Sequence, residues 1–134
     1  MSTLVRITRD NHADLWPLAV TRIRAFSLRY GAKPDGLINS LWTLFATNSP
    51  LCGIWGALPD ASAYESPDGP SRRLIGHIVT TIEPFNGATV AWVMQCEMDR
   101  RTPQAFVDRF LLEMEDWIAQ ANTVLPPANK VTET

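Results

Sequence analysis

The feature that most constrains the fold of this chain is the join between residues 89–97 and residues 102–122. The first segment, TVAWVMQCE, is mostly apolar and β-prone, which is typical of a buried strand. Thr102 fits the cap of a helix and Pro103 its first turn. Apolar residues then recur at helical spacing: Phe106, Phe110, Met114, Trp117 and Ile118. The chain is therefore predicted to pass from a buried strand through a basic turn into an amphipathic helix.

The segments before this join predict a meander of strands. Residues 74–82 form a second apolar, β-prone run, and the Asn86-Gly87 pair that follows it is a strong signal for a tight hairpin turn. A third run, residues 51–58, comes before a loop at 59–73 that is rich in Pro, Ser, Asp and Gly. We expect these runs to form successive antiparallel strands.

The N-terminal third predicts a short strand at residues 4–8 and two helices, at residues 12–30 and 33–46. Three arginines of the first helix lie mostly off its apolar stripe, so we expect them on a solvated face: Arg22, Arg24 and Arg29. This basic helix contrasts with an acidic last helix, and such asymmetry also suits a docking surface.

The resulting order is β-α-α-β-β-β-α, which predicts an α+β fold with a mostly antiparallel central sheet and helices on both faces. The length of 134 residues suits one domain, which we place at residues 1–122. The remaining residues, 123–134, form a tail containing Pro126-Pro127. This tail either frays or docks as an irregular strand.

Composition argues against several classes of protein. The formal net charge of −2 gives no basis for binding nucleic acid. No apolar run approaches the ~18 residues of a membrane-spanning helix. The first residues lack the apolar core of a signal peptide. We therefore expect a soluble cytoplasmic or otherwise intracellular protein without membrane or nucleic-acid partners.

The cysteines and histidines predict no metal site, because Cys52, Cys96, His12 and His77 are not spaced as metal ligands. Both cysteines are expected to be small core residues on strands that flank the strand of His77. Two strand spacings, about 10 Å, are too far for a disulfide. No Ser, Cys or carboxylate is spaced in the sequence so as to form a catalytic pair with His77, so we expect it to be packed or half-exposed in its strand.

The element order resembles the N-terminal two-thirds of the GCN5-related N-acetyltransferase (GNAT) fold, over about residues 3–122. The phrase RLIGHIV at residues 73–79 and the strand-turn-helix at 91–118 carry this resemblance. The family's cofactor motif is Arg/Gln-x-x-Gly-x-Gly/Ala, and Arg100 and Ala105 match it. The resemblance implies a fold that holds acetyl-CoA at the helix N-terminus. It places the candidate cofactor-binding residues at Cys96, Met98, Arg100, Arg101, Gln104 and Ala105.

Two departures from the family predict a truncated and degenerate site. Pro103 stands where the motif has its first glycine, which removes one N–H donor from the pyrophosphate cradle. Little chain follows the last helix, where the family has further strands that complete the acceptor side. The family often has a tyrosine acid in that region, but the only tyrosines here are Tyr30 and Tyr64.

Glu97 is the candidate catalytic residue, because it ends the central strand near the place where a base would reach an amine. The alternative, which we favour, is a surface carboxylate that pairs with Arg100 or Arg101. Gln95 could bind a substrate, but a polar residue at a strand edge needs no function.

Two functions remain open from the sequence. The favoured one is a non-catalytic, GNAT-like interaction or assembly module, with protein partners or a homo-oligomer and no cofactor. Degenerate GNAT-like proteins among bacteriophage virion and accessory proteins suggest that setting by analogy, including a virion-associated location. The alternative is an acyl-CoA-dependent N-acetyltransferase that uses acetyl-CoA and whose site is completed by a partner subunit.

Overall fold

The computed structural model describes residues 3–58, 65–66, 69–70, 74–99, 104–126 and 130–133. Its elements follow the predicted order, with short strands added. They are β1 (Thr3–Arg6), α1 (His12–Arg29), α2 (Pro34–Ala46), β2 (Cys52–Leu58), β3 (Glu65–Ser66), β4 (Gly69–Pro70), β5 (Gly76–Phe85), β6 (Ala88–Met98), α3 (Gln104–Val124) and β7 (Val131–Glu133).

The main sheet has the order β1-β2-β5-β6-β7. Its first four strands pair antiparallel, and β7 joins β6 in parallel. The turn between β5 and β6 has φ values of 50° at Asn86 and 81° at Gly87, as a hairpin turn of the predicted kind requires. The mostly antiparallel meander is confirmed.

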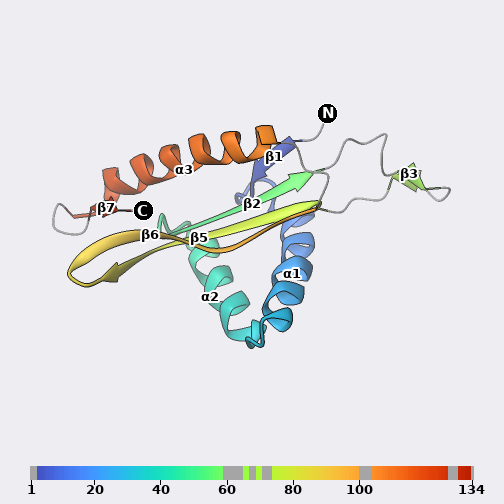
Figure 1. The fold of residues 1–134 in the computed structure, drawn as a ribbon, viewed down its shortest axis with the longest axis horizontal. Helices are drawn as coiled ribbons and strands as arrows, with labels where there is room; N and C mark the ends of the chain where they lie inside the picture. The colour runs from blue at the N-terminus through green and yellow to red at the C-terminus, as the bar shows by residue number, and fades with distance from the viewer. Residues whose placement is uncertain are drawn as a thin grey trace.

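Helices cover both faces of the sheet, as the sequence predicted. Figure 1 shows α1 and α2 on one face and α3 across the other. Successive side chains of strand β2 point to opposite faces of the sheet, so the sheet separates two core clusters. Trp55 packs on the α3 side, whereas Ile54 packs on the α1 and α2 side. Buried residues of α3 complete the first cluster: Phe106, Phe110, Met114, Trp117 and Ala121.

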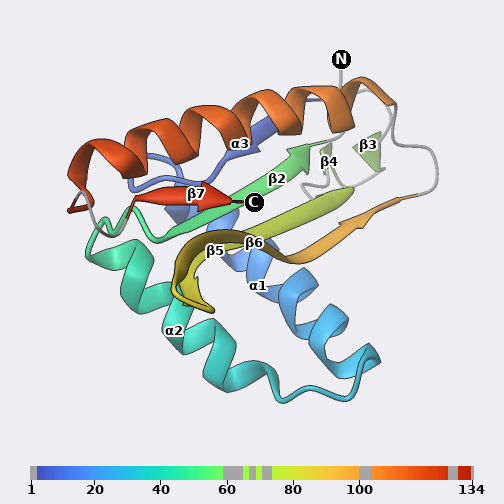
Figure 2. The same cartoon turned by 60° about the vertical axis from the view of Figure 1, so that its left-hand side comes forward.

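The tail docks rather than frays. Val131 of β7 pairs with Thr89 of β6 and is buried, and Figure 2 shows β7 beside β6 and below α3. Asn122 of α3 holds this strand, since its side chain exchanges two hydrogen bonds with the backbone of Val131 (2.7 and 3.3 Å). Val124 belongs to α3 and forms no strand.

Strand β5 is longer than the apolar run that predicted it, because it continues past Ile82 through Pro84 to Phe85. This extension carries the hairpin out beyond the covered part of the sheet (Figure 1). Among the described residues, no helix is long and apolar enough to cross a membrane.

Candidate functional site

A buried polar chain links β5, β6 and α1. The Nε2 of His77 lies 2.9 Å from Oε1 of Gln95, and the Nε2 of Gln95 donates to Oγ of Ser27 at 3.0 Å. All three residues are buried, and the ring of Phe26 meets the His77 imidazole edge-on. Since an amide oxygen can only accept, Nε2 of His77 carries the proton. The prediction that His77 is packed in its strand is confirmed.

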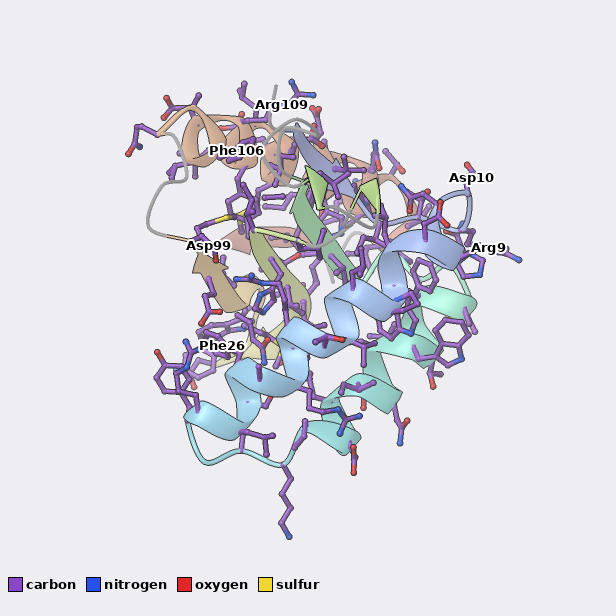
Figure 3. All side chains as sticks on the ribbon, turned by 90° about the vertical axis from the view of Figure 1, so that its right-hand side faces the viewer. Arg9, Asp10, Phe26, Asp99, Phe106 and Arg109 are labelled. Carbon is purple, nitrogen blue, oxygen red and sulfur yellow. The ribbon has the colours of Figure 1, made fainter. Side chains whose placement is uncertain are left out.

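Arg22 of α1 connects these hydrogen-bonded residues to the end of β6. Its Nε donates to Nδ1 of His77 at 3.3 Å, and its Nη1 donates to the carbonyl of Leu74 at 3.0 Å. The same guanidinium pairs with Glu97 at 3.2 Å and Asp99 at 3.4 Å. In Figure 3, Phe26 on α1 and Asp99 after β6 lie on the same side of the molecule. Arg22 therefore ties the helix to the sheet, and its expected place on a solvated face is wrong because this contact covers it.

Glu97 is held by two arginines of α1. Its Oε1 accepts from Arg22 and its Oε2 accepts from Arg29. The expected partners, Arg100 and Arg101, lie outside the described residues. Both carboxylate oxygens already accept charge-assisted hydrogen bonds, so the geometry favours a structural ion pair over a base for a substrate. Gln95 is likewise occupied, because both ends of its amide bond within the protein.

The candidate cofactor residues flank the turn between β6 and α3. Cys96 is exposed, and Gln104 and Ala105 are exposed in the first turn of α3. Met98 packs against the core on the α3 side, over Gly76, where a Cβ would lie 2.1 Å from its sulfur. Arg100, Arg101 and Pro103 lie outside the described residues. The described part of this junction thus offers a helix start and exposed side chains, while Met98 is engaged in packing.

Cys96 corrects one prediction, since we expected it in the core and it is exposed, whereas Cys52 is buried as expected. The reason is that β7 pairs only with Thr89 and Val90, so no described strand covers β6 beyond that point. Cys52 and Cys96 do lie on the strands either side of β5, and both are free thiols.

The two thiols are expected to differ in reactivity. Burial raises the pKa of Cys52 to about 11, so roughly one Cys52 thiol in a thousand is ionised at pH 8, and access to it is blocked. Cys96 is accessible, although partial burial also raises its pKa. A disulfide reagent at pH 8 should titrate one fast thiol per native chain and both after unfolding. The variant Cys96→Ser should lose the fast-reacting thiol. If it lost the slow-reacting thiol instead, the assignment of the fast thiol to Cys96 would be wrong.

His77 should make folding pH-dependent. Burial lowers its pKa below the usual value, with the Arg22 charge acting in the same direction, while the Gln95 hydrogen bond and the Glu97 charge oppose the shift. In the unfolded chain, His77 therefore binds a proton near pH 6.5, whereas in the folded chain it stays neutral at that pH. The free energy of unfolding falls as the pH drops below that value. The slope is at most about 1.4 kcal/mol per pH unit for one proton.

Urea unfolding between pH 7.5 and 5.5 measures this slope, and His77→Gln should flatten it. The glutamine amide retains a donor for Gln95 and an acceptor for Arg22. An unchanged slope in the variant would assign the pH dependence to other groups.

Exposed apolar side chains, here termed the β6 patch, flank the open edge of the sheet on its two faces. The patch consists of Phe85, Trp92, Val93 and Met94, and the rings of Phe85 and Trp92 meet edge-on. Met94 has no partner on β5, because the pairing register shifts there. The sequence predicted a buried strand here, and nothing in a continuous apolar run tells a covered strand from an uncovered one.

Comparisons with known proteins give the fold. No family model matches the chain, and no curated protein matches it. An aminoglycoside acetyltransferase from an uncultured soil metagenomic sample covers 99% of this chain and 76% of its own, with a TM-score of 0.55 and 12% identity. The chain has a GNAT-like fold.

Two further solved structures agree with this GNAT-like fold. One is the acetyltransferase AAC(6')-Iy in complex with a bisubstrate analogue of coenzyme A, at a TM-score of 0.53 and 13% identity, covering 99% of this chain and 76% of that one. The other is a probable acetyltransferase, at 0.51 and 18% identity, covering 98% of this chain and 75% of that one. At these identities the likeness is one of fold, and the bacteriophage setting stays a prediction.

Proposed function

We propose that this chain is a non-catalytic assembly module on a GNAT-like fold, and that it self-associates through the β6 patch. The observation that carries the proposal is the open edge of β6 with its exposed apolar side chains. Among the described residues, β7 pairs with β6 only at Thr89 and Val90. The strand beyond that point therefore presents unpaired backbone groups next to exposed apolar surface.

Natural proteins protect sheet edges with charged residues, proline, very short strands or β-bulges. From Ala91 to Cys96, β6 contains no charged residue and no proline, and its one irregularity is the register shift at Met94. An uncharged edge without proline is a template for pairing with another strand, and the residues on either side of Met94 remain regular strand. This supports a role for the edge as a binding surface.

A second copy of this chain is the partner that fits the patch. Two identical edges brought together antiparallel form a closed, two-fold symmetric contact. None of the four side chains of the β6 patch is charged, so self-pairing places no like charges opposite one another there. Aromatic and β-branched side chains, such as Trp92 and Val93, are those that pair well across strands.

The polar cluster supports the non-catalytic part of the proposal. The residues that the sequence marked for chemistry are Glu97, Gln95 and His77, and each is bound within the chain. Freeing Glu97 for a substrate would break its ion pairs with Arg22 and Arg29.

The experiment compares Val93→Lys with Leu112→Lys by sedimentation velocity. Both wild-type residues are exposed and apolar, but Leu112 lies on α3 and outside the β6 patch. A lysine on a sheet edge opposes strand pairing. Val93→Lys should therefore sediment as a monomer at concentrations where wild type and Leu112→Lys associate. Equal association of both variants would sink the proposal.

An acyl-CoA-dependent N-acetyltransferase is the second candidate, favoured by the acetyltransferases among the fold neighbours. The start of α3 fits a pyrophosphate in principle, since a helix N-terminus offers free N–H groups. Gln104 and Ala105 would lie beside it, with Cys96 at the strand end and Arg100 and Arg101 in the turn. A partner subunit would complete the acceptor side.

Thermal denaturation with acetyl-CoA and coenzyme A separates the two candidates. A bound cofactor raises the melting temperature by mass action, by an amount that grows with its concentration. The assembly proposal expects no such rise at about 1 mM ligand, where even a weak site would be occupied. A saturable rise that is lost in Arg100→Ala would favour the enzyme.

A further inference from the structure

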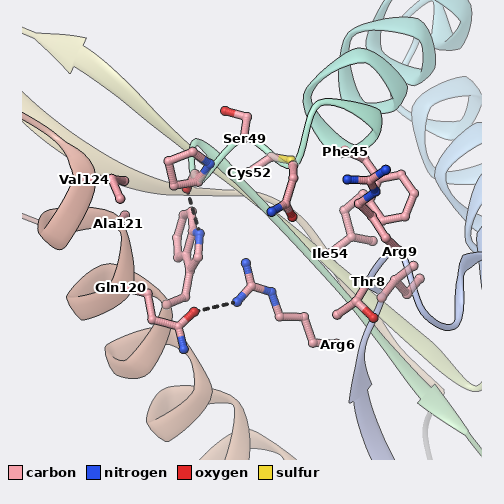
Figure 4. Close-up of a pocket in the computed structure, with 14 residues that line it drawn as sticks. Arg6, Thr8, Arg9, Phe45, Ser49, Cys52, Ile54, Gln120, Ala121 and Val124 are labelled. Atoms are coloured by element: carbon pink, nitrogen blue, oxygen red, sulfur yellow. Dashed lines mark hydrogen bonds between the residues drawn. The ribbon is translucent and has the colours of Figure 1, made fainter.

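A second possible site lies away from the junction of β6 and α3. A cavity of about 320 Å³ opens between β1, the start of β2, the segment after α2 and the C-terminal half of α3 (Figure 4). This volume lies within the usual range for small-molecule pockets, at its lower end. Gln104 and Ala105 lie at the other end of α3, and none of the candidate cofactor residues that the structure describes lines the cavity.

The charge of the cavity wall is positive. Two arginines, Arg6 and Arg9, line it, and the other twelve of its fourteen lining residues include no Asp or Glu. The chain as a whole has a net charge of −2, so this wall differs from the average surface. Glu113 acts on Arg6 electrostatically from outside the lining.

Arg6 is held in place and aimed into the cavity. Its guanidinium lies over the Trp55 ring, 5.6 Å from the centroid, and its Nη1 donates to Oε1 of Gln120 at 3.3 Å. Figure 4 shows the side chain directed into the pocket. Burial lowers the pKa of Arg6, because the charged guanidinium loses part of its hydration there. A bound anion would offset that loss.

Two buried rings lie beneath the cavity. The Trp117 indole is fixed there, because its Nε1 donates to the carbonyl of Pro50 at 3.0 Å, and its side chain is only 1% exposed. Phe45 is buried as well, and Asn48 and Ser49 supply hydrogen-bonding groups beside these rings. The wall therefore offers a ligand cations and neutral polar groups.

We infer that this cavity binds a small organic anion, with its carboxylate or phosphate facing Arg6 and Arg9. Guanidinium groups suit both kinds of anion, because their planar N–H donors match two oxygens at once. The inference does not depend on self-association, since no residue of the β6 patch lines the cavity.

The test uses phenyl phosphate, benzoate and neutral benzamide as probes, followed by the indole N–H resonance of Trp117 in NMR titrations. Both anions should shift this resonance with saturation, and benzamide should bind at least about tenfold more weakly. The two anions separate a phosphate site from a carboxylate site by their relative affinities.

Arg9→Gln is the decisive variant, because Arg9 is exposed and its loss leaves the core intact. It should weaken anion binding about tenfold, whereas Arg24→Gln, which alters an exposed arginine of α1 outside the cavity, should leave binding unchanged. Arg6→Gln should weaken binding as well. No saturable shift up to about 10 mM, equal binding of benzamide, or unaltered binding in Arg9→Gln would each overturn the inference.

Discussion

Replacing Arg22 with alanine is expected to lower the free energy of unfolding by about 3 kcal/mol. The side chain is only 17% exposed and contacts His77, the Leu74 carbonyl, Glu97 and Asp99. Its removal leaves the buried carbonyl of Leu74 without the Arg22 donor and leaves Glu97 with Arg29 as its remaining cation, and both losses are costly. The ion pair itself adds less, because its gain is offset by the desolvation of both charges.

Arg24→Ala is the matched control, since Arg24 lies on the same helix and also has an acidic partner. Its pair with Asp35 is exposed, at 47% and 80% for the two side chains. Pairs of this kind contribute between about 0 and 1 kcal/mol. Urea unfolding followed by circular dichroism measures both variants. Similar losses for Arg22 and Arg24 would mean that the polar cluster at the end of β6 does not hold α1 to the sheet.

Trp117→Ala is expected to destabilise the fold by about 4 kcal/mol, the range for loss of a buried aromatic side chain. The side chain is 1% exposed and meets Trp55 edge-on, with centroids 6.0 Å apart. Its indole N–H also binds the Pro50 carbonyl, so the variant loses a hydrogen bond and leaves a cavity between α3 and the sheet.

Trp42→Ala provides the comparison, because Trp42 is 42% exposed on α2 and packs on Trp16 and Phe45. We expect a loss of about 1 kcal/mol, since solvent already reaches one side of this ring and no enclosed cavity forms. Chemical unfolding of the two variants gives the difference directly. A loss at Trp42 as large as that at Trp117 would contradict the division of the core between the two faces.

The order of elements could be predicted because local signals encode it. Asn86-Gly87 specified the hairpin, and apolar residues at helical spacing specified α1 and α3. These signals depend on neighbours a few positions apart. They also implied helices on both faces of the sheet, because helices come both before and after the strands in the chain.

The candidate site could not be predicted in the same way. Arg22 and Glu97 are 75 positions apart, and helical spacing alone placed Arg22 toward solvent. Cys96 was expected in the core because its strand is apolar, yet only a partner strand could cover that edge. The cavity at Arg6 is built from four separate segments, and no spacing in the sequence brings them together.

If the β6 patch joins two copies of this chain, the wild-type protein should dimerise in solution. Sedimentation velocity from about 5 to 200 µM measures this, since the range spans dissociation constants of moderate interfaces. The weight-average sedimentation coefficient should rise from the monomer value toward that of a dimer, without larger species. A monomer at every concentration would contradict this expectation.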